Sequence, residues 1–164
     1  MEVILADETA MTAAGAALAS GLPDLASRSL LLGLSGELGS GKTTLARGLL
    51  RELGVAGAIR SPTFTLVEPY ATARGTVHHL DLYRLETGAP ALEGLGYREL
   101  RGSPGLVMVE WPERSGVALG TPDLSARLAH RDHGRSLELE ASTESGRAWL
   151  DACRALLEEC GVSR

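Results

Sequence analysis

The feature that most constrains this chain is the segment GELGSGKTT, which runs from Gly36 to Thr44. It fits the pattern G-x-x-x-x-G-K-[ST] at Gly36, Gly41, Lys42 and Thr43, a match that a chain of this length reaches by chance about once in 200. An apolar run precedes the segment and an amphipathic run follows it, as the motif requires. The segment therefore predicts a phosphate-binding loop between a strand and a helix, and an accidental glycine-rich turn is the disfavoured alternative.

The chemistry of such a loop explains the residue types in it. Glycines let successive backbone N–H groups point inward at an anion, and the N-terminus of the following helix adds partial positive charge. Lysine and arginine together number 16, and Lys42 is the only lysine. An ammonium is compact, whereas the flat guanidinium fork is too bulky for a tight loop. We therefore expect Lys42 to contact the β- and γ-phosphates and the Thr43 hydroxyl to contact Mg²⁺.

The hydrophobic pattern alternates strands with helices, which predicts an α/β fold. Continuous apolar runs such as Leu30–Leu34 are typical of strands buried on both faces. Strands are expected at 2–6, 30–34, 65–70, 76–80, 106–109, 124–130 and 135–141, with a turn at 71–75 and another at Asp132–Gly134. Helices are expected at 7–20, from about 42 to Gly54, at 89–100 with glycine breaks, and along a C-terminal face of Trp149, Cys153, Leu156 and Cys160. This pattern predicts one P-loop NTPase-like domain over residues 1–164, with three layers and a mostly parallel central sheet extended by antiparallel strands.

Composition narrows the function classes. The net charge is −5 and the pI is about 5.4, which disfavours a protein that grips DNA or RNA through a broad basic surface of its own. Cys153 and Cys160 are seven residues apart, too far for a disulfide within one helix, and they form no metal-binding spacing. The N-terminal residues do not resemble a signal peptide, and no apolar run approaches the ~20 residues of a membrane span. We expect a cytoplasmic protein without a membrane partner.

Two carboxylates are candidates for the second half of a P-loop site. Glu110 follows the apolar run Leu106–Val109, and Asp81 follows the run Val77–Leu80. Ligands of open α/β sheets bind beyond the carboxyl ends of the parallel strands, so both residues fit a role near Mg²⁺ or its water. A solvated strand end is the alternative for each.

A further segment, Ser61, Pro62, Thr63, Phe64 and Thr65, follows the predicted phosphate-loop helix. Nucleotide-sensing loops often lie there, and Thr63 or Thr65 is placed to reach the γ-phosphate or its metal; an ordinary Ser-Pro turn is the alternative. His79 lies two residues before Asp81, so strand alternation puts both on one side, although a purely structural histidine is favoured. Trp111 is a candidate for shielding the site or for meeting a partner, and core packing is equally compatible with the sequence.

The motifs GELGSGKTT, SPTFTLVEPY, HLDLYRLE and VMVEWPE together, in this order and spacing, resemble the bacterial TsaE family. The resemblance runs from about Asp7 to Leu139. It implies an ATPase that binds ATP and Mg²⁺, hydrolyses slowly alone, and supports threonylcarbamoyladenosine synthesis in tRNA. The implied partners are TsaB and TsaD, where TsaD carries out the transfer to adenosine and this chain meets tRNA only through the complex.

The resemblance also implies roles for individual residues. Lys42 and Asp81 are the expected catalytic residues, Thr43 and Glu110 the expected Mg²⁺ ligands, and residues 61–65 a switch-like loop. The segment Asp7–Met11, with Thr9 and Met11, and also Arg135 match regions that border the adenine. The residues expected to bind the nucleotide are Gly36, Gly39, Ser40, Gly41, Lys42, Thr43, Thr44, Thr9, Met11 and Arg135.

Two other functions compete with this one. A small-molecule or nucleotide kinase on the same fold usually carries an arginine-bearing lid, and no long insert with clustered arginines is present. A regulatory GTPase needs an N/T-K-x-D motif, which this chain lacks because Lys42 is its only lysine.

P-loop hydrolysis also needs a positive group on the γ-phosphate. Arg60 and Arg84 are the nearest candidates in sequence for a group acting in cis, but the resemblance to TsaE favours a site that is completed only in a complex with a partner.

Overall fold

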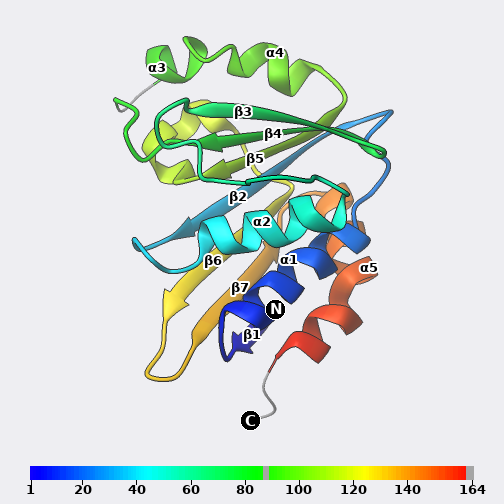
Figure 1. Cartoon of the computed structure of the whole chain (residues 1–164). Helices are drawn as coiled ribbons and strands as arrows, with labels where there is room; N and C mark the ends of the chain where they lie inside the picture. Colours follow the sequence, from blue (N-terminus) through cyan, green and yellow to red (C-terminus); the bar gives the residue numbers. More distant parts are fainter. Residues whose placement is uncertain (87–88, 162–164) are drawn as a thin grey trace.

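The computed structural model describes residues 1–86 and 89–161, which fold around one seven-stranded sheet (Figure 1). The strand order across the sheet is β1-β7-β6-β2-β5-β4-β3. The strands are β1 (Glu2–Leu5), β2 (Ser29–Gly36), β3 (Val67–Thr72), β4 (Gly75–Asp81), β5 (Gly105–Glu110), β6 (Leu124–His130) and β7 (Arg135–Ala141).

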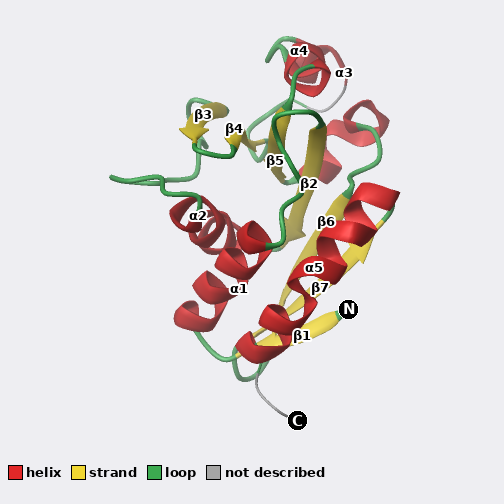
Figure 2. Cartoon of the chain, turned by 90° about the vertical axis from the view of Figure 1, so that its right-hand side faces the viewer, coloured by secondary structure: helices red, strands yellow, loops and turns green. Residues whose placement is uncertain are grey.

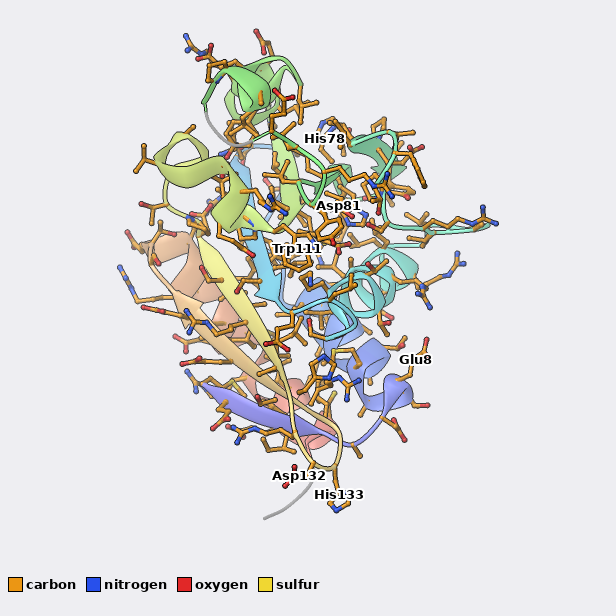
Figure 3. All side chains as sticks on the ribbon, turned by 90° about the vertical axis from the view of Figure 1, so that its left-hand side faces the viewer. Glu8, His78, Asp81, Trp111, Asp132 and His133 are labelled. Atoms are coloured by element: carbon orange, nitrogen blue, oxygen red, sulfur yellow. The ribbon has the colours of Figure 1, made fainter. Side chains whose placement is uncertain are left out.

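The middle of the sheet is parallel and its edges are antiparallel. Strand β2 pairs in parallel with β5 and β6, and β5 pairs in parallel with β4. Strand β7 is antiparallel to β6 and β1, and the edge strand β3 is antiparallel to β4. The predicted α/β fold with a largely parallel centre and added antiparallel strands is therefore confirmed. The predicted β6–β7 hairpin is also confirmed, with Asp132 and His133 at its tip (Figure 3).

Side-chain alternation on the central strands builds two cores, one on each face of the sheet. Leu30, Leu32 and Leu34 join a large core with α1 (Glu8–Ser20), α2 (Lys42–Glu52) and α5 (Glu144–Cys160). Leu31 joins a smaller core on the other face. That core is covered by α3 (Ala89–Glu93), α4 (Tyr97–Gly102) and the 3-10 helix η1 (Pro112–Leu119). In Figure 2, α3 and α4 lie together at the top of the view, away from α1, α2 and α5. The helices and the sheet thus form three layers.

Buried polar contacts join these layers. The carboxylate of Asp123, just before β6, accepts hydrogen bonds from the Leu31 amide of β2 at 2.8 Å and from the Thr143 hydroxyl at 2.6 Å. Thr143 is the N-cap of α5 and also accepts from the Gly146 amide at 3.0 Å. Asp123 therefore fixes the start of α5 against the central strand that leads into the phosphate loop.

The C-terminal helix is turned differently from the prediction. Trp149 and Cys153 are buried as expected, but Leu156 is 42% exposed and Leu157 is fully buried. Leu150 is buried too, which moves the centre of the buried face toward 150 and 157. The predicted place of Leu156 on the buried face is therefore wrong. The helix is rotated so that Leu150 and Leu157 are buried together with Trp149 and Cys153, and this rotation leaves Leu156 on the exposed side.

The β3–β4 hairpin also differs from the prediction. Strand β3 begins at Val67 instead of Thr65 and continues to Thr72, so the connecting turn is shorter than 71–75. Leu66 has a φ of 64°, and its amide donates to the Pro62 carbonyl at 2.6 Å. This local turn takes Thr65 and Leu66 out of the strand. Within residues 1–86 and 89–161, no helix has the length and hydropathy needed to cross a bilayer.

Candidate functional site

The phosphate loop has the conformation that its glycines permit. It leaves β2 at Gly36 and enters α2 at Lys42, with Gly39 at φ 74° and Gly41 at φ 107°. A side chain at Gly36 would place its Cβ 2.3 Å from the Leu128 carbonyl oxygen of β6, so only glycine fits there. The predicted strand–loop–helix context is confirmed.

Lys42 is held at the centre of this loop and is only 4% exposed. Its ammonium donates to the carbonyl oxygens of Gly36 at 2.7 Å and Glu37 at 2.9 Å. The same ammonium lies 3.8 Å from the centre of the Trp111 ring, a close cation–π contact. Trp111 follows β5 in a left-handed conformation with φ 60°. It therefore covers the phosphate-loop lysine and also packs against the smaller core, two of the roles that the sequence allows.

The electrostatics of Lys42 are set by burial and by nearby carboxylates. Burial lowers the pKa of the Lys42 ammonium, and the negative charges of Glu110, Glu113 and Asp81 oppose that shift. Burial thus disfavours the charged form of Lys42, and the acidic neighbours and the loop carbonyls stabilise that form. An anion brought against this ammonium would favour its charged form further.

Thr43 and Glu110 meet directly. The Thr43 hydroxyl is 3.0 Å from each carboxylate oxygen of Glu110, which is 2% exposed at the end of β5. The fully buried His79 lies 2.9 Å from the same carboxylate through its Nε2 atom. A hydroxyl and a carboxylate are hard oxygen ligands of the kind that Mg²⁺ prefers, so these residues fit the predicted metal. Across residues 1–86 and 89–161, no cluster of three or more His, Cys, Asp or Glu side chains is arranged for a metal.

Asp81 lies beside Glu110 because β4 and β5 pair in parallel with these two residues in register. One of its carboxylate oxygens accepts from the Ser61 hydroxyl and from the Thr63 hydroxyl, the latter at 2.9 Å. The other oxygen accepts from the Tyr83 amide at 2.9 Å. Asp81 is thus buried, at 3% exposed, and tied to the loop 61–65. Figure 3 labels Asp81, the last residue of β4, and Trp111, which follows β5; both line the same cavity.

These residues surround a cavity of about 430 Å³ that borders the phosphate loop and is called the phosphate cavity below. Seven side chains predicted from the sequence line it: Lys42, Thr43, Thr44, Ser61, Thr63, Asp81 and Glu110. Three more were not assigned to the site: Leu38, Tyr83 and Trp111. Arg84, one of the two arginines proposed from the sequence, also lines the cavity. The cavity therefore joins a cationic loop to a pair of buried carboxylates.

The switch-like loop divides between two sides. Ser61 and Thr63 face Asp81 and the phosphate cavity. Phe64 and Thr65 instead border a separate surface groove, together with Arg60. Of the two threonines that the sequence left open, only Thr63 reaches the phosphate cavity. The hydrogen bond from the Leu66 amide to the Pro62 carbonyl closes a turn in this loop, and the nucleotide-sensing role of the loop stays a prediction.

A second cavity of about 230 Å³ lies on the other side of the loop, against the start of α1. Met11, Arg135 and Ser40 line it, and their predicted contact with the nucleotide stays a prediction. The Arg135 guanidinium donates to the Gly39 carbonyl at 3.5 Å. Thr9 is exposed and lies outside this cavity, because two helical positions from the buried Met11 correspond to about 200° of rotation.

Two residues of the site carried weak sequence signals. The sequence favours a structural role for His79, and the structure places its Nε2 atom against the Glu110 carboxylate; the alternation of His79 with Asp81 is the signal for this placement. Its Nδ1 atom is buried and has no hydrogen-bond partner within the described part of the chain. Tyr83 packs against Trp111 with ring centroids 5.0 Å apart, and no local pattern pointed to that contact.

Comparison with known proteins gives a consistent result. Residues 5–139 match the family model described as "Threonylcarbamoyl adenosine biosynthesis protein TsaE". A relative named "tRNA threonylcarbamoyladenosine biosynthesis protein TsaE" from Haemophilus influenzae is 37% identical over 125 residues, covering 76% of this chain and 78% of the relative. The protein of the same name from Streptomyces coelicolor is 46% identical over 126 residues, covering 74% and 84%. The crystal structure of Bacillus subtilis YdiB superposes with a TM-score of 0.71 at 24% identity, over 97% of this chain and 95% of that one, which supports the fold.

Proposed function

The chain belongs to the TsaE family of tRNA threonylcarbamoyladenosine biosynthesis proteins, and on that premise we propose that it is an ATPase. In this proposal its hydrolysis of Mg-ATP supports the modification of tRNA by TsaB and TsaD, resetting or activating their complex. The observation that carries the proposal is the single cavity shared by Lys42, Thr43, Asp81 and Glu110. Each of these four side chains matches a part that P-loop hydrolysis needs.

The loop itself supports a phosphate ligand. The Ser40 hydroxyl is fully buried and has no hydrogen-bond partner among residues 1–86 and 89–161, and Ser40 borders the cavity beside Met11. An unpaired buried hydroxyl is costly, and a phosphate oxygen would satisfy it. The triphosphate would extend from the Met11 and Arg135 side toward Lys42, and so connect the two cavities.

The residues divide the reaction among them. Lys42 neutralises the β- and γ-phosphates, and Thr43 with Glu110 would hold Mg²⁺, which when bound neutralises further charge on these phosphates. Asp81 orients the attacking water. The water oxygen bonds to the γ-phosphorus while the bond to the bridging β–γ oxygen breaks. That electron pair remains on ADP, and the water proton leaves to solvent as inorganic phosphate forms.

Exposed apolar side chains support a partner at this site. Leu38 is 71% exposed and Tyr83 is 37% exposed at the phosphate cavity, and Phe64 is 84% exposed on the adjoining loop. Large apolar side chains gathered around a polar cavity are typical of an interaction surface. We propose that TsaB and TsaD cover this rim and accelerate hydrolysis, and that the net charge of −5 leaves tRNA binding to those partners. The proposed activity belongs in the cytoplasm, where tRNA is used.

The test is a tRNA threonylcarbamoylation assay reconstituted from TsaB and TsaD. Adding this chain with ATP is expected to sustain repeated turnover, whereas the Lys42→Met variant is not. Inorganic phosphate should appear in proportion to the modified tRNA. A γ-phosphate recovered on an acceptor molecule would instead favour the alternative, a P-loop small-molecule or nucleotide kinase.

A further inference from the structure

A second positively charged side chain, Arg84, lines the phosphate cavity besides Lys42. Among the residues that line it, Lys42 and Arg84 are the two with permanent positive side chains. Lys42 is committed to the loop, where it contacts the Gly36 and Glu37 carbonyls. Arg84 is the group left to meet the charge that develops on a γ-phosphate during hydrolysis, a role that an arginine often supplies.

The backbone before Arg84 is fixed to both carboxylate-bearing strands. The Leu82 amide donates to the Glu110 carbonyl at 3.1 Å, and the Tyr83 amide donates to the Asp81 carboxylate at 2.9 Å. Leu82 is fully buried. Arg84 therefore projects from a rigid turn immediately beside the predicted catalytic residues.

The Arg84 side chain itself is held weakly. Its guanidinium lies 4.6 Å from the centre of the Phe64 ring. Within the described part of the chain, it forms no hydrogen bond or salt bridge. The N–H donors of the Arg84 guanidinium are therefore available to a ligand. The contact that restrains this guanidinium is with the Phe64 ring, and Phe64 is 84% exposed. An exposed cation–π contact is weak compared with paired, charge-assisted hydrogen bonds from arginine to phosphate.

We propose that Arg84 is the cis-acting arginine of this site and that Phe64 restrains it. In hydrolysis the guanidinium exchanges the Phe64 ring for the γ-phosphate oxygens as the bond to the bridging oxygen breaks. It forms no covalent bond; it stabilises negative charge while water adds and ADP leaves. This inference rests on the proposed function, because it needs a γ-phosphate in the cavity.

The position of Phe64 links this device to a partner. Phe64 is adjacent to Thr63, whose hydroxyl donates to the Asp81 carboxylate, so the loop that carries the ring also contacts the predicted catalytic carboxylate at the end of β4. A protein that buries the Phe64 ring would release the guanidinium and shift the loop at the same time. Slow hydrolysis by the chain alone follows from the restraint, without any arginine supplied by the partner.

Arg60 provides a matched control for Arg84. It flanks the same loop on its other side and borders the outer groove with Phe64, Glu68 and Tyr70. It is not among the residues that line the phosphate cavity. Replacing Arg60 removes the same charge from the same loop region without touching the proposed contact.

The first experiment measures transition-state binding together with turnover. Mg-ADP affinity is titrated with and without aluminium fluoride, and steady-state phosphate release is measured with Mg-ATP. We expect Arg84→Ala to reduce both phosphate release and the gain in affinity from aluminium fluoride at least tenfold, with Mg-ADP affinity unchanged. Arg84→Lys should not restore them, and Arg60→Ala should behave as the parent. A parent-like Arg84→Ala variant overturns this inference alone, whereas a parent with no fluoride gain and no phosphate release overturns the proposed function.

The second experiment tests the restraint. Phe64→Ala should raise phosphate release by the chain alone about threefold or more, since a weak contact restrains the guanidinium. The double variant Phe64→Ala/Arg84→Ala should show no such rise. A gain that persists in the double variant, or no gain in the single variant, would overturn the restraining role of Phe64. Unchanged thermal melting is expected, because the ring is exposed.

Discussion

Replacing Lys42 separates the charge of the phosphate loop from its shape. The ammonium is nearly fully buried, lies 2.7 and 2.9 Å from two loop carbonyls, and sits 3.8 Å from the centre of the Trp111 ring. Lys42→Met keeps the aliphatic stem and removes the cation. Lys42→Arg keeps the cation but adds a longer, planar group to a space already closed by Trp111.

The expected size of the loss follows from the charge interaction. Two unit charges about 4 Å apart interact by about 4 kcal/mol at the effective dielectric constant near a protein surface. At about 1.4 kcal/mol per tenfold change, Lys42→Met should weaken ATP binding about 10³-fold. We expect Lys42→Arg to lose at least about 10²-fold, because the guanidinium must displace the Trp111 ring or the loop.

Isothermal titration with Mg-ATP measures both losses, and thermal unfolding serves as the control. Melting temperatures should stay within about 4 °C of the parent, since neither change removes core packing. Near-parental ATP affinity in Lys42→Arg would refute the steric explanation for a lone lysine in an arginine-rich chain. Near-parental affinity in Lys42→Met would refute the phosphate-loop assignment itself.

Three substitutions and one cysteine-labelling experiment test other parts of the site and fold. Glu110→Gln should weaken nucleotide binding at least about tenfold in the presence of Mg²⁺ but not in EDTA, as measured by titration. Asp81→Ala should keep ATP affinity and slow phosphate release about 10²-fold; parental turnover in both variants would mean that the site is misassigned. Asp123→Ala should lower the free energy of unfolding in urea by about 3 kcal/mol, because it leaves the buried Leu31 amide and the half-buried Thr143 hydroxyl without their acceptor; a loss under about 1 kcal/mol would contradict this. Burial raises the pKa of the Cys153 thiol to about 11, so it stays protonated at pH 8, and alkylation followed by mass spectrometry should label Cys160 first and Cys153 only after unfolding.

The parts of the site that sequence predicts best are those fixed by a strand and the residue after it. Glu110 and Asp81 could be placed at one edge because each ends a buried apolar run, and parallel strands present these ends together. The register that makes them neighbours is set by β4–β5 pairing and confirms that reasoning. Lys42 and Thr43 followed from the loop motif in the same way.

The parts that sequence could not place depend on loops meeting across the fold. The contact of Arg84 with Phe64 joins residues twenty apart, and no periodicity relates them. Strand β3 begins at Val67 instead of Thr65, because the Leu66 amide donates to the Pro62 carbonyl in a local turn. The strand pattern in the sequence does not reveal this turn. Leu156 was misplaced because the stripe of four residues ignored the packing of Leu150 and Leu157 against the sheet.

The central claim is that this chain hydrolyses ATP and does so productively with TsaB and TsaD. The most direct measurement is steady-state phosphate release at fixed Mg-ATP, with and without the TsaB–TsaD pair, alongside gel filtration in ATP. We predict slow release by the chain alone, a rise of at least about tenfold with the pair, and comigration of the three proteins. An unchanged rate together with separate elution would contradict the account.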